Sequence, residues 1–408
     1  MTAAASLALG QRSLKDPDLR YPLWPPLTQG CPRTSTDTVA YPVEVEYDHD
    51  RVDPSLFAPG VPRGRASGLD RWAPLMPPLA APGLGEGGTP LVEIGEGVYV
   101  KDESRNPTWS HKDRLNRCTV SAAVGVRAPG IVVASSGNHG ASAAAYAARA
   151  GLRCVVFTAE DHPPAVDAFL HAYGAVVLPV PIAARWPLTR RVVDEMGLHP
   201  VSNLTPTHTG HGFGPEGYKS IAYEIHQDLG VPAALFVPTG YAELLYGVWK
   251  GFTELRLLGV TDRVPRLFSC EPAAGAPLAR ALRAGQPAVE VSPGPTDAYG
   301  IASPVGGYRG VVAVRDSGGR ALEVTDAEMA SAREELARSG LWVELSAAAG
   351  LAGLRQLSRL GQVEGPVVCL STSSGFKDRS VGASRRSEPV SPEWEAVRER
   401  LRAEGIHG

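Results

Sequence analysis

The sequence predicts an α/β protein with two open, mostly parallel sheets, and three observations lead to that class. The chain has 408 residues, which is enough for two ordinary domains. Its residues are 43% hydrophobic and 20% charged, as in a globular protein with a core. From Gly87 onward, short apolar strands alternate with alanine-rich helical stretches. Such alternation is typical of parallel sheets that are covered on both faces.

The first 85 residues lack this alternation. They are rich in proline, glycine and arginine and contain one strand-like segment, at 43–47. We therefore expect residues 1–85 to form an N-terminal arm that covers another part of the molecule.

The alternating region predicts the elements in order. Strands are expected at 131–134, 153–157 and 175–178, with helices at 139–150 and 163–173. Further along, helices are expected at 216–229, 243–258, 326–339 and 346–360, and strands at 234–237, 266–269 and 366–370.

These elements suggest a division into domains. We expect a small mobile α/β domain at 131–215 and a large ligand-binding domain made of 86–130 and 216–385. A ligand should lie between them, at the carboxyl ends of the strands. Residues 386–408 are expected to form a C-terminal tail helix that packs through an apolar side.

Composition argues against several classes of function. The net charge of −3 and scattered arginines give no basis for nucleic-acid binding. No apolar run is long enough to span a membrane, and no export signal is evident, so we expect a cytoplasmic protein. Five widely spread cysteines without a Cys-x-x-Cys pair predict neither a disulfide framework nor a metal site.

Lys112 is the strongest indication of chemistry. The chain has only six lysines against thirty-four arginines, and Lys112 lies in the polar run 101–114. Arginine stays protonated, whereas a partly desolvated lysine can lose its proton and attack an aldehyde to form a Schiff base. The obvious aldehyde cofactor is pyridoxal 5'-phosphate (PLP).

Three polar turns follow predicted strands. The turn 135–140, Ser-Ser-Gly-Asn-His-Gly, leads into a helix and presents N–H groups to an anion such as a substrate carboxylate. Asn138 adds an amide for a ring hydroxyl. An ordinary strand-to-helix turn with a serine cap remains the alternative.

The other two turns suit the remaining parts of such a cofactor. Residues 239–243, here called the phosphate turn, join a strand to a helix and can hold a phosphate through backbone donors. The run 371–378 offers hydroxyl groups. A hydroxyl facing a pyridine nitrogen leaves that nitrogen unprotonated, which favours elimination and replacement over transamination.

Several motifs, taken together, resemble a known family. In order and spacing, the chain resembles threonine synthase and, more broadly, the tryptophan synthase β-like (fold type II) PLP enzymes. The resemblance covers about residues 70 to 380 and is carried by segments 85–91, 101–104, 106–114, 135–138, 216–225, 249–252 and 375–378.

This resemblance implies a set of roles. Lys112 would form the Schiff base and later move the substrate α-proton, Asn138 would bind the ring hydroxyl, and Thr372 would face the pyridine nitrogen. The phosphate would be held by Thr239, Gly240, Tyr241, Ala242 and Glu243. The substrate would contact Thr108, Trp109, Ser110, His111, Ser135, Ser136, Gly137, Asn138 and His139. We also expect a homodimer.

The sequence departs from the family at three places. Trp109 replaces a glycine, and His111 replaces a phenylalanine and is either catalytic or structural. The phosphate turn has Tyr241, Ala242 and Glu243 where threonine synthases usually have glycines. A carboxylate in the first helical turn would repel a phosphate. We expect Glu243 to point away so that the backbone amides still serve; the alternative is reduced cofactor affinity.

The leading functional hypothesis is a PLP-dependent carbon–oxygen lyase or synthase, threonine synthase-like, that acts on a small and optionally O-phosphorylated amino acid. A serine or threonine dehydratase, or a β-replacement synthase of the cysteine or cysteate synthase type, is a second hypothesis. His139 follows Ser-Ser-Gly-Asn as in the dehydratases. A catalytically idle ligand-binding paralogue is a third hypothesis, motivated by Glu243.

Overall fold

The computed structural model describes residues 5–58, 68–359, 364–379, 381 and 389–406. The chain divides into two compact units, Met1–Asp378 and Arg379–Gly408. The first unit contains three sheets. The second contains one described helix, α11 (Trp394–Ala403). Part of the predicted tail, residues 386–388 and 407–408, lies outside the described residues.

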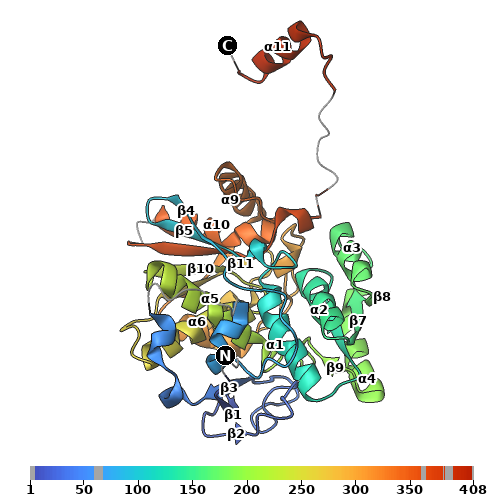
Figure 1. Ribbon diagram of the computed structural model, residues 1–408, viewed down its shortest axis with the longest axis vertical. Helices are drawn as coiled ribbons and strands as arrows, with labels where there is room; N and C mark the ends of the chain where they lie inside the picture. Colours follow the sequence, from blue (N-terminus) through green and yellow to red (C-terminus); the bar gives the residue numbers. More distant parts are fainter. Residues whose placement is uncertain (1–4, 59–67, 360–363, 380, 382–388, 407–408) are drawn as a thin grey trace. The chain divides into compact units, whose positions relative to one another are not determined.

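The N-terminal arm forms a small antiparallel sheet in the order β2-β1-β3 (Figure 1, blue). Its strands are β1 (Ala8–Ser13), β2 (Arg20–Tyr21) and β3 (Val43–Tyr47), and the predicted strand at 43–47 is confirmed. Sequence reasoning missed β1 because an apolar residue of this strand is exposed and a polar residue is buried. Leu9 is exposed, whereas Gln11 is buried and binds backbone groups of Pro22 and Leu27.

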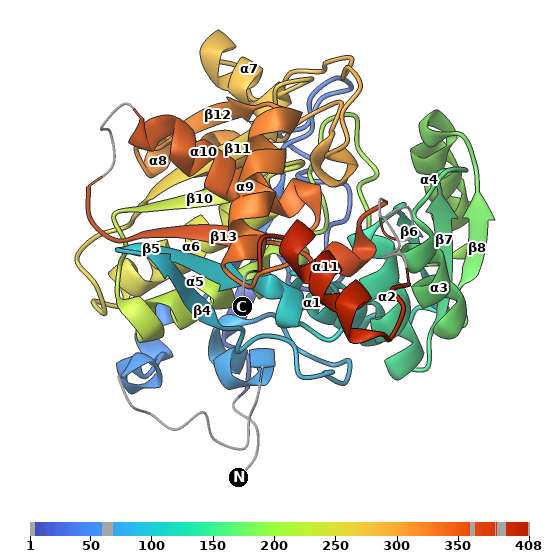
Figure 2. The ribbon, with the colours of Figure 1, turned by 90° about the horizontal axis from the view of Figure 1, so that it is seen from above.

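The large sheet has the order β12-β11-β10-β13-β5-β4, and only β4 is antiparallel to its neighbour. Its strands are β4 (Leu91–Gly95), β5 (Val98–Asp102), β10 (Ala234–Pro238), β11 (Arg266–Pro272), β12 (Arg320–Val324) and β13 (Val367–Ser371). Helices α9 (Asp326–Arg338) and α10 (Ala349–Ser358) cover one face, and α5 (Gly214–Leu229) and α6 (Glu243–Leu257) cover the other (Figure 2).

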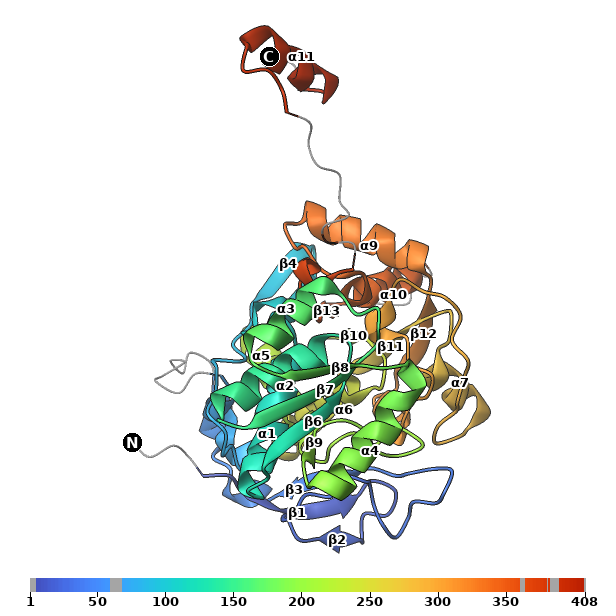
Figure 3. The same ribbon diagram turned by 90° about the vertical axis from the view of Figure 1, so that its right-hand side faces the viewer.

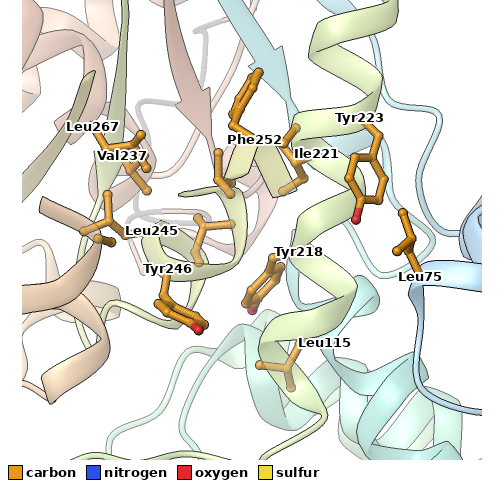
Figure 4. Close-up of a cluster of buried hydrophobic side chains, with 14 of the residues drawn as sticks. Leu75, Leu115, Tyr218, Ile221, Tyr223, Val237, Leu245, Tyr246, Phe252 and Leu267 are labelled. Atoms are coloured by element: carbon orange, nitrogen blue, oxygen red, sulfur yellow. The ribbon is translucent and has the colours of Figure 1, made fainter. Parts of the chain in front are cut away.

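Side chains of β10 alternate between these two helical layers. Leu235 and Val237 belong to the apolar cluster of α5 and α6, whereas Ala234 and Phe236 belong to the cluster of α9 and α10. This alternation of period two, with both sides apolar, explains why a buried parallel strand reads as a continuous hydrophobic run. In the first cluster, Tyr218, Ile221 and Tyr223 project from α5 (Figure 4).

The small sheet has the order β8-β7-β6-β9 and is entirely parallel. Its strands are β6 (Gly130–Ala134), β7 (Arg153–Thr158), β8 (Val176–Pro179) and β9 (His199–Pro200). Helices α2 (Asn138–Arg149) and α3 (Pro164–Ala172) lie on one face and α4 (Arg185–Met196) on the other (Figure 3). The buried alanines of α2 allow close packing against α1 (Lys112–Gly125) and the sheet.

The predicted strands and helices of the alternating region are confirmed, with end points that differ by at most three residues. Sequence reasoning did not predict α4, α7 (Pro277–Ala284), α8 (Tyr308–Asp316) or β12. Helix α4 contains Pro187, and a proline in the sequence usually argues against a helix. Here the proline is tolerated because it lies in the first turn of α4. The predicted domain boundaries stay a prediction. Within the described segments, no helix is long and apolar enough to cross a membrane.

Candidate active site

Lys112 is the first residue of α1, and the preceding residue fixes its position. The backbone N–H of His111 donates to the carbonyl of Thr372 at 3.0 Å, and ring Nδ1 lies 3.0 Å from the same oxygen. Burial lowers the pKa of His111 well below its usual value, so the ring is neutral and Nδ1 must carry the proton it donates. The start of α1 is thereby tied to the end of β13.

The Lys112 amine is chemically available. It is partly buried, and in the described structure it makes no hydrogen bond or ion pair. It lies 5.6 Å from the ring centroid of Tyr218. Burial lowers the pKa of Lys112, although the negative charge of Glu243 opposes this shift. A lowered pKa increases the fraction of neutral, nucleophilic amine.

Asn138 begins α2 and connects the small sheet to the end of β13. Ser373 Oγ donates to Asn138 Oδ1 at 3.1 Å, and Asn138 Nδ2 lies 3.3 Å from both carboxylate oxygens of Glu344. Burial raises the pKa of Glu344. The amide that sequence analysis assigns to the ring hydroxyl is therefore held at both ends.

The serines of the turn 135–140 support the turn itself. Ser135 Oγ accepts from the N–H groups of Gly137 and Gly140 at 3.2 and 3.0 Å. Ser136 Oγ accepts from Ala159 N–H at 2.6 Å and from Arg185 at 3.1 Å. Each hydroxyl keeps its own hydrogen for a ligand, and the helix N-terminus adds amide donors.

His139 is electrically neutral at this turn. Burial lowers the pKa of His139 to about 3, and its Nε2 is buried without a hydrogen-bond partner among the described residues. A neutral ring with a bare nitrogen can accept a hydrogen bond from a bound group.

Thr108 and Ser110 differ in how their hydroxyl groups are used. Thr108 donates both its N–H and its hydroxyl to Asp113, at 2.7 and 2.6 Å, so it shapes the loop before α1. Burial raises the pKa of Asp113 to about 6. Ser110 Oγ is buried and has no partner in the described part of the chain, which leaves it available to a ligand.

Trp109 adopts a backbone conformation in the left-handed region, with φ of +62°. Its ring packs edge-on against Phe169 of α3, with centroids 5.2 Å apart, and lies 5.4 Å from Phe376. The side chain is 41% exposed. Trp109 therefore bridges the small-sheet region and the segment after β13.

The phosphate turn contains a non-glycine residue in the left-handed region. Ala242 has φ of +63°. The hydroxyl group of Thr239 donates to the carbonyl oxygen of Val237 at 2.8 Å and so stabilises the turn. The ring of Tyr241 stacks on that of His208, with centroids 4.1 Å apart.

Glu243 does not point away, contrary to our expectation. Its side chain is buried, and Oε1 lies so close to Gly210 that a Cβ on that residue would be 2.0 Å away. Oε2 is 4.0 Å from Nε2 of His208. Burial raises the pKa of Glu243, while the positive charges of Lys112 and Arg309 oppose this shift.

Sequence reasoning missed Glu344, Arg185 and His208, because each reaches the site from a distant part of the chain. Three further lysines, Lys219, Lys250 and Lys377, are buried. Nζ of Lys377 has no hydrogen-bond partner among the described residues, and burial lowers the pKa of Lys377 to about 8. The scarcity of lysine in the sequence was the signal for these positions.

A family model described as pyridoxal-phosphate dependent enzyme matches residues 83–373. The chain belongs to this family. A threonine synthase of Methanosarcina acetivorans is 32% identical over 355 residues, covering 81% of this chain and 86% of that one. A threonine synthase of Mycobacterium tuberculosis is 33% identical over 324 residues, covering 76% and 85%.

Solved structures share the fold. A maize serine racemase superposes with a TM-score of 0.61 at 20% identity, covering 78% of this chain and 94% of that chain. An O-ureido-L-serine synthase superposes with a TM-score of 0.58 at 22% identity, covering 79% and 97%. The chain is thus a PLP-dependent lyase or synthase of threonine synthase-like sequence, with the fold of the type II enzymes.

The residues present fit the cofactor at its aldehyde and ring. Lys112 offers an uncommitted amine with a lowered pKa, and Asn138 is held beside the end of β13, where Thr372 lies. At the phosphate end, Ala242 has a positive φ and the side chain of Glu243 lies buried against Gly210.

Proposed function

We propose that this enzyme catalyses elimination and replacement on a small amino acid whose side chain carries an anionic leaving group. The observation that supports this proposal most directly is the uncommitted, partly buried Lys112 amine at the meeting point of β13, α1 and α2. When bound, PLP withdraws electrons from the substrate α-carbon and makes its proton removable.

The protein's own groups would divide the remaining work. Lys112 would hold the cofactor covalently through its aldehyde carbon and move the proton at the substrate α-carbon. Asn138 would bind the ring hydroxyl, and Thr372 would face the pyridine nitrogen. The amides of residues 136, 138 and 139 at the N-terminus of α2 would bind the substrate carboxylate.

A phosphorylated substrate of the threonine synthase type is the first specific proposal. The relatives named threonine synthase support it, and so does Lys377, a buried ammonium without a hydrogen-bond partner among the described residues. Lys377 lies within electrostatic range of Glu344, which contacts Asn138. An unpaired buried cation is costly, and an anionic substrate group would relieve that cost.

We further propose a cytoplasmic homodimer. All five cysteines are buried and unpaired, which suits a reducing compartment. Light scattering of the purified chain tests the dimer, and a monomer that turns over substrate would contradict it.

The central test combines cofactor labelling with a substrate panel. Borohydride reduction after incubation with PLP should fix the cofactor on Lys112, as read by peptide mass spectrometry, and K112A should lose both the label and turnover. Phosphate release from O-phosphohomoserine, but not from O-phosphoserine with a thiol or sulfite, would support threonine synthase-type chemistry. Labelling of another lysine would overturn the assignment.

β-Chemistry is the second candidate function. It is favoured by His139, a neutral histidine directly after Asn138, and by Trp109, which replaces a glycine in the substrate segment. Ammonia release from threonine or serine, or replacement of the O-phosphoserine side group, would favour it. The absence of turnover with every amino acid tested would instead favour the idle paralogue.

A further inference from the structure

The carboxylate of Glu243 occupies a place that the fold provides for it. It lies 8% exposed in the first turn of α6, with Oε1 packed against the backbone of Gly210. A Cβ at Gly210 would be 2.0 Å from this oxygen, and Gly210 itself has φ of +59°. Any other residue at 210 would displace the carboxylate or strain the backbone.

Positive charge lies around Glu243, although burial raises the pKa of its carboxyl group above the usual value. The first amide groups of α6 have no acceptor within the helix, and the helix dipole places positive charge there. Arg309 is 2% exposed, and its Nε is buried without a hydrogen-bond partner in the described structure. Arg309 and Lys112 both exert their positive charge on the Glu243 carboxyl.

The opposite side of the phosphate turn is also filled. The ring of Tyr241 stacks on His208, with centroids 4.1 Å apart, and its centroid lies 6.0 Å from that of Trp186 in α4. A Cβ at Gly240 would be 2.9 Å from Ser303 Oγ. The phosphate turn is therefore closely packed around Gly240 and Tyr241.

We infer that the Glu243 carboxylate stands in for the cofactor phosphate at the N-terminus of α6, so that this chain takes up phosphate-free pyridoxal-type aldehydes at least as readily as PLP. The inference rests on the proposed role of Lys112. A phosphate and a carboxylate are both attracted to the positive end of the same helix, and they repel each other at close range. Binding of PLP then requires Glu243 to leave its place, whereas binding of pyridoxal does not.

The test is a pair of absorbance titrations, with pyridoxal and with PLP, on the full chain and on Glu243→Gly and Glu243→Gln. The unchanged protein should bind the two aldehydes with similar affinity, or pyridoxal more tightly. Glu243→Gly should tighten PLP binding by at least about tenfold while changing pyridoxal binding by less than about threefold. Glu243→Gln keeps the volume and removes the charge, so it should give a smaller shift in the same direction.

Glu334→Gln is the matched control, because Glu334 is an exposed carboxylate on helix α9. It should leave both titrations unchanged, and thermal unfolding should show that all variants fold. A strong preference for PLP in the unchanged protein that neither Glu243 variant increases would overturn the inference but leave the Lys112 assignment intact. If neither aldehyde labels Lys112, the proposed function and this inference both fall.

Discussion

Trp109 adopts a backbone conformation that costs free energy for any residue with a Cβ. Its φ of +62° lies in the left-handed region, which is disfavoured for L-residues by about 1 kcal/mol or more. The contacts of its ring with Phe169 and Phe376 offset this cost. The folded protein therefore tolerates a strained backbone at Trp109, three residues before Lys112.

This strain predicts an unusual order of stability at position 109. W109G should be more stable than W109A by about 1 kcal/mol, because both lose the ring contacts but only glycine removes the backbone strain. Urea unfolding of the two variants measures the difference. Trp342 is the control, since it also contacts Phe376 and has no positive φ. At position 342, W342A should be more stable than W342G. If glycine were the more stable variant at both positions, or alanine at both, the argument would be contradicted.

Single residues of the site were predictable to different extents. Lys112 and Asn138 stand in local patterns, namely a lysine in a lysine-poor chain and a polar turn after a strand. Glu344 could not be inferred, because it reaches Asn138 across 206 positions in the sequence. Local spacing carries no information about such a contact.

Helices α5 and α6 are joined by a buried ionic network. Lys219 of α5 lies 2.8 Å from Glu216 and 2.9 Å from Glu254, and Lys250 of α6 lies 2.7 Å from Glu216. All four side chains are almost fully buried. Because α6 begins at the phosphate turn, this network also positions one wall of the site.

Removal of one charge from this network should be severe. E254Q leaves Lys219 with one carboxylate partner and should lower the free energy of unfolding by about 3–5 kcal/mol. E334Q, in an exposed pair with Arg338, should change it by less than about 0.5 kcal/mol. Chemical denaturation of both variants tests this contrast. Equal, small effects would show that the buried network contributes no more than a surface pair.

Among the elements, buried strands and long helices were the predictable part. The apolar run of β10 and the alanine-rich α2 are local signals, and both are found. Strand β1 was missed because Gln11 is buried by contacts with later residues, which reverses the polarity pattern expected of a strand.

On the scale of the whole molecule, the N-terminal arm holds together the helices that bear the site. Val45 of β3 accepts from Lys250 of α6, and Tyr47 donates to Glu216 of α5. Arg309 of α8 donates to Val43 in the arm. The expectation that the arm covers another part of the molecule is confirmed, because the arm connects three helices of the large-sheet region.

The buried carboxylates that join the arm to these helices predict that the free energy of unfolding falls steeply at acid pH. Burial opposes ionisation of Glu44 and Glu254, but Lys250 and Arg12 lower the pKa of Glu44 to about 2, and Lys219 chiefly lowers the pKa of Glu254 to about 2. Because these pKa values lie below 4.5 in the folded state, their stabilisation is present above pH 4.5 and is lost as pH falls toward 2.

Each of these two carboxylates should account for on the order of 3 kcal/mol of that loss. Buried neutral histidines act in the same direction, since the unfolded chain takes up their protons first. Urea unfolding between pH 4.5 and 2.5 measures the slope, which E44Q should reduce. A flat profile would show that the buried carboxylates are not held in their charged form.

The sequence by itself determined the α/β class, the order of the main strands and helices, the lysine and the turns at strand ends. These features depend on periodicity and on residues within a few positions of one another. Only the tertiary structure decided that Glu243 turns inward against Gly210, that Lys219 and Lys250 are paired in the interior, and that Glu344 faces Asn138. Each of these outcomes depends on burial and counter-charges supplied by distant segments, which become neighbours only when the chain is folded.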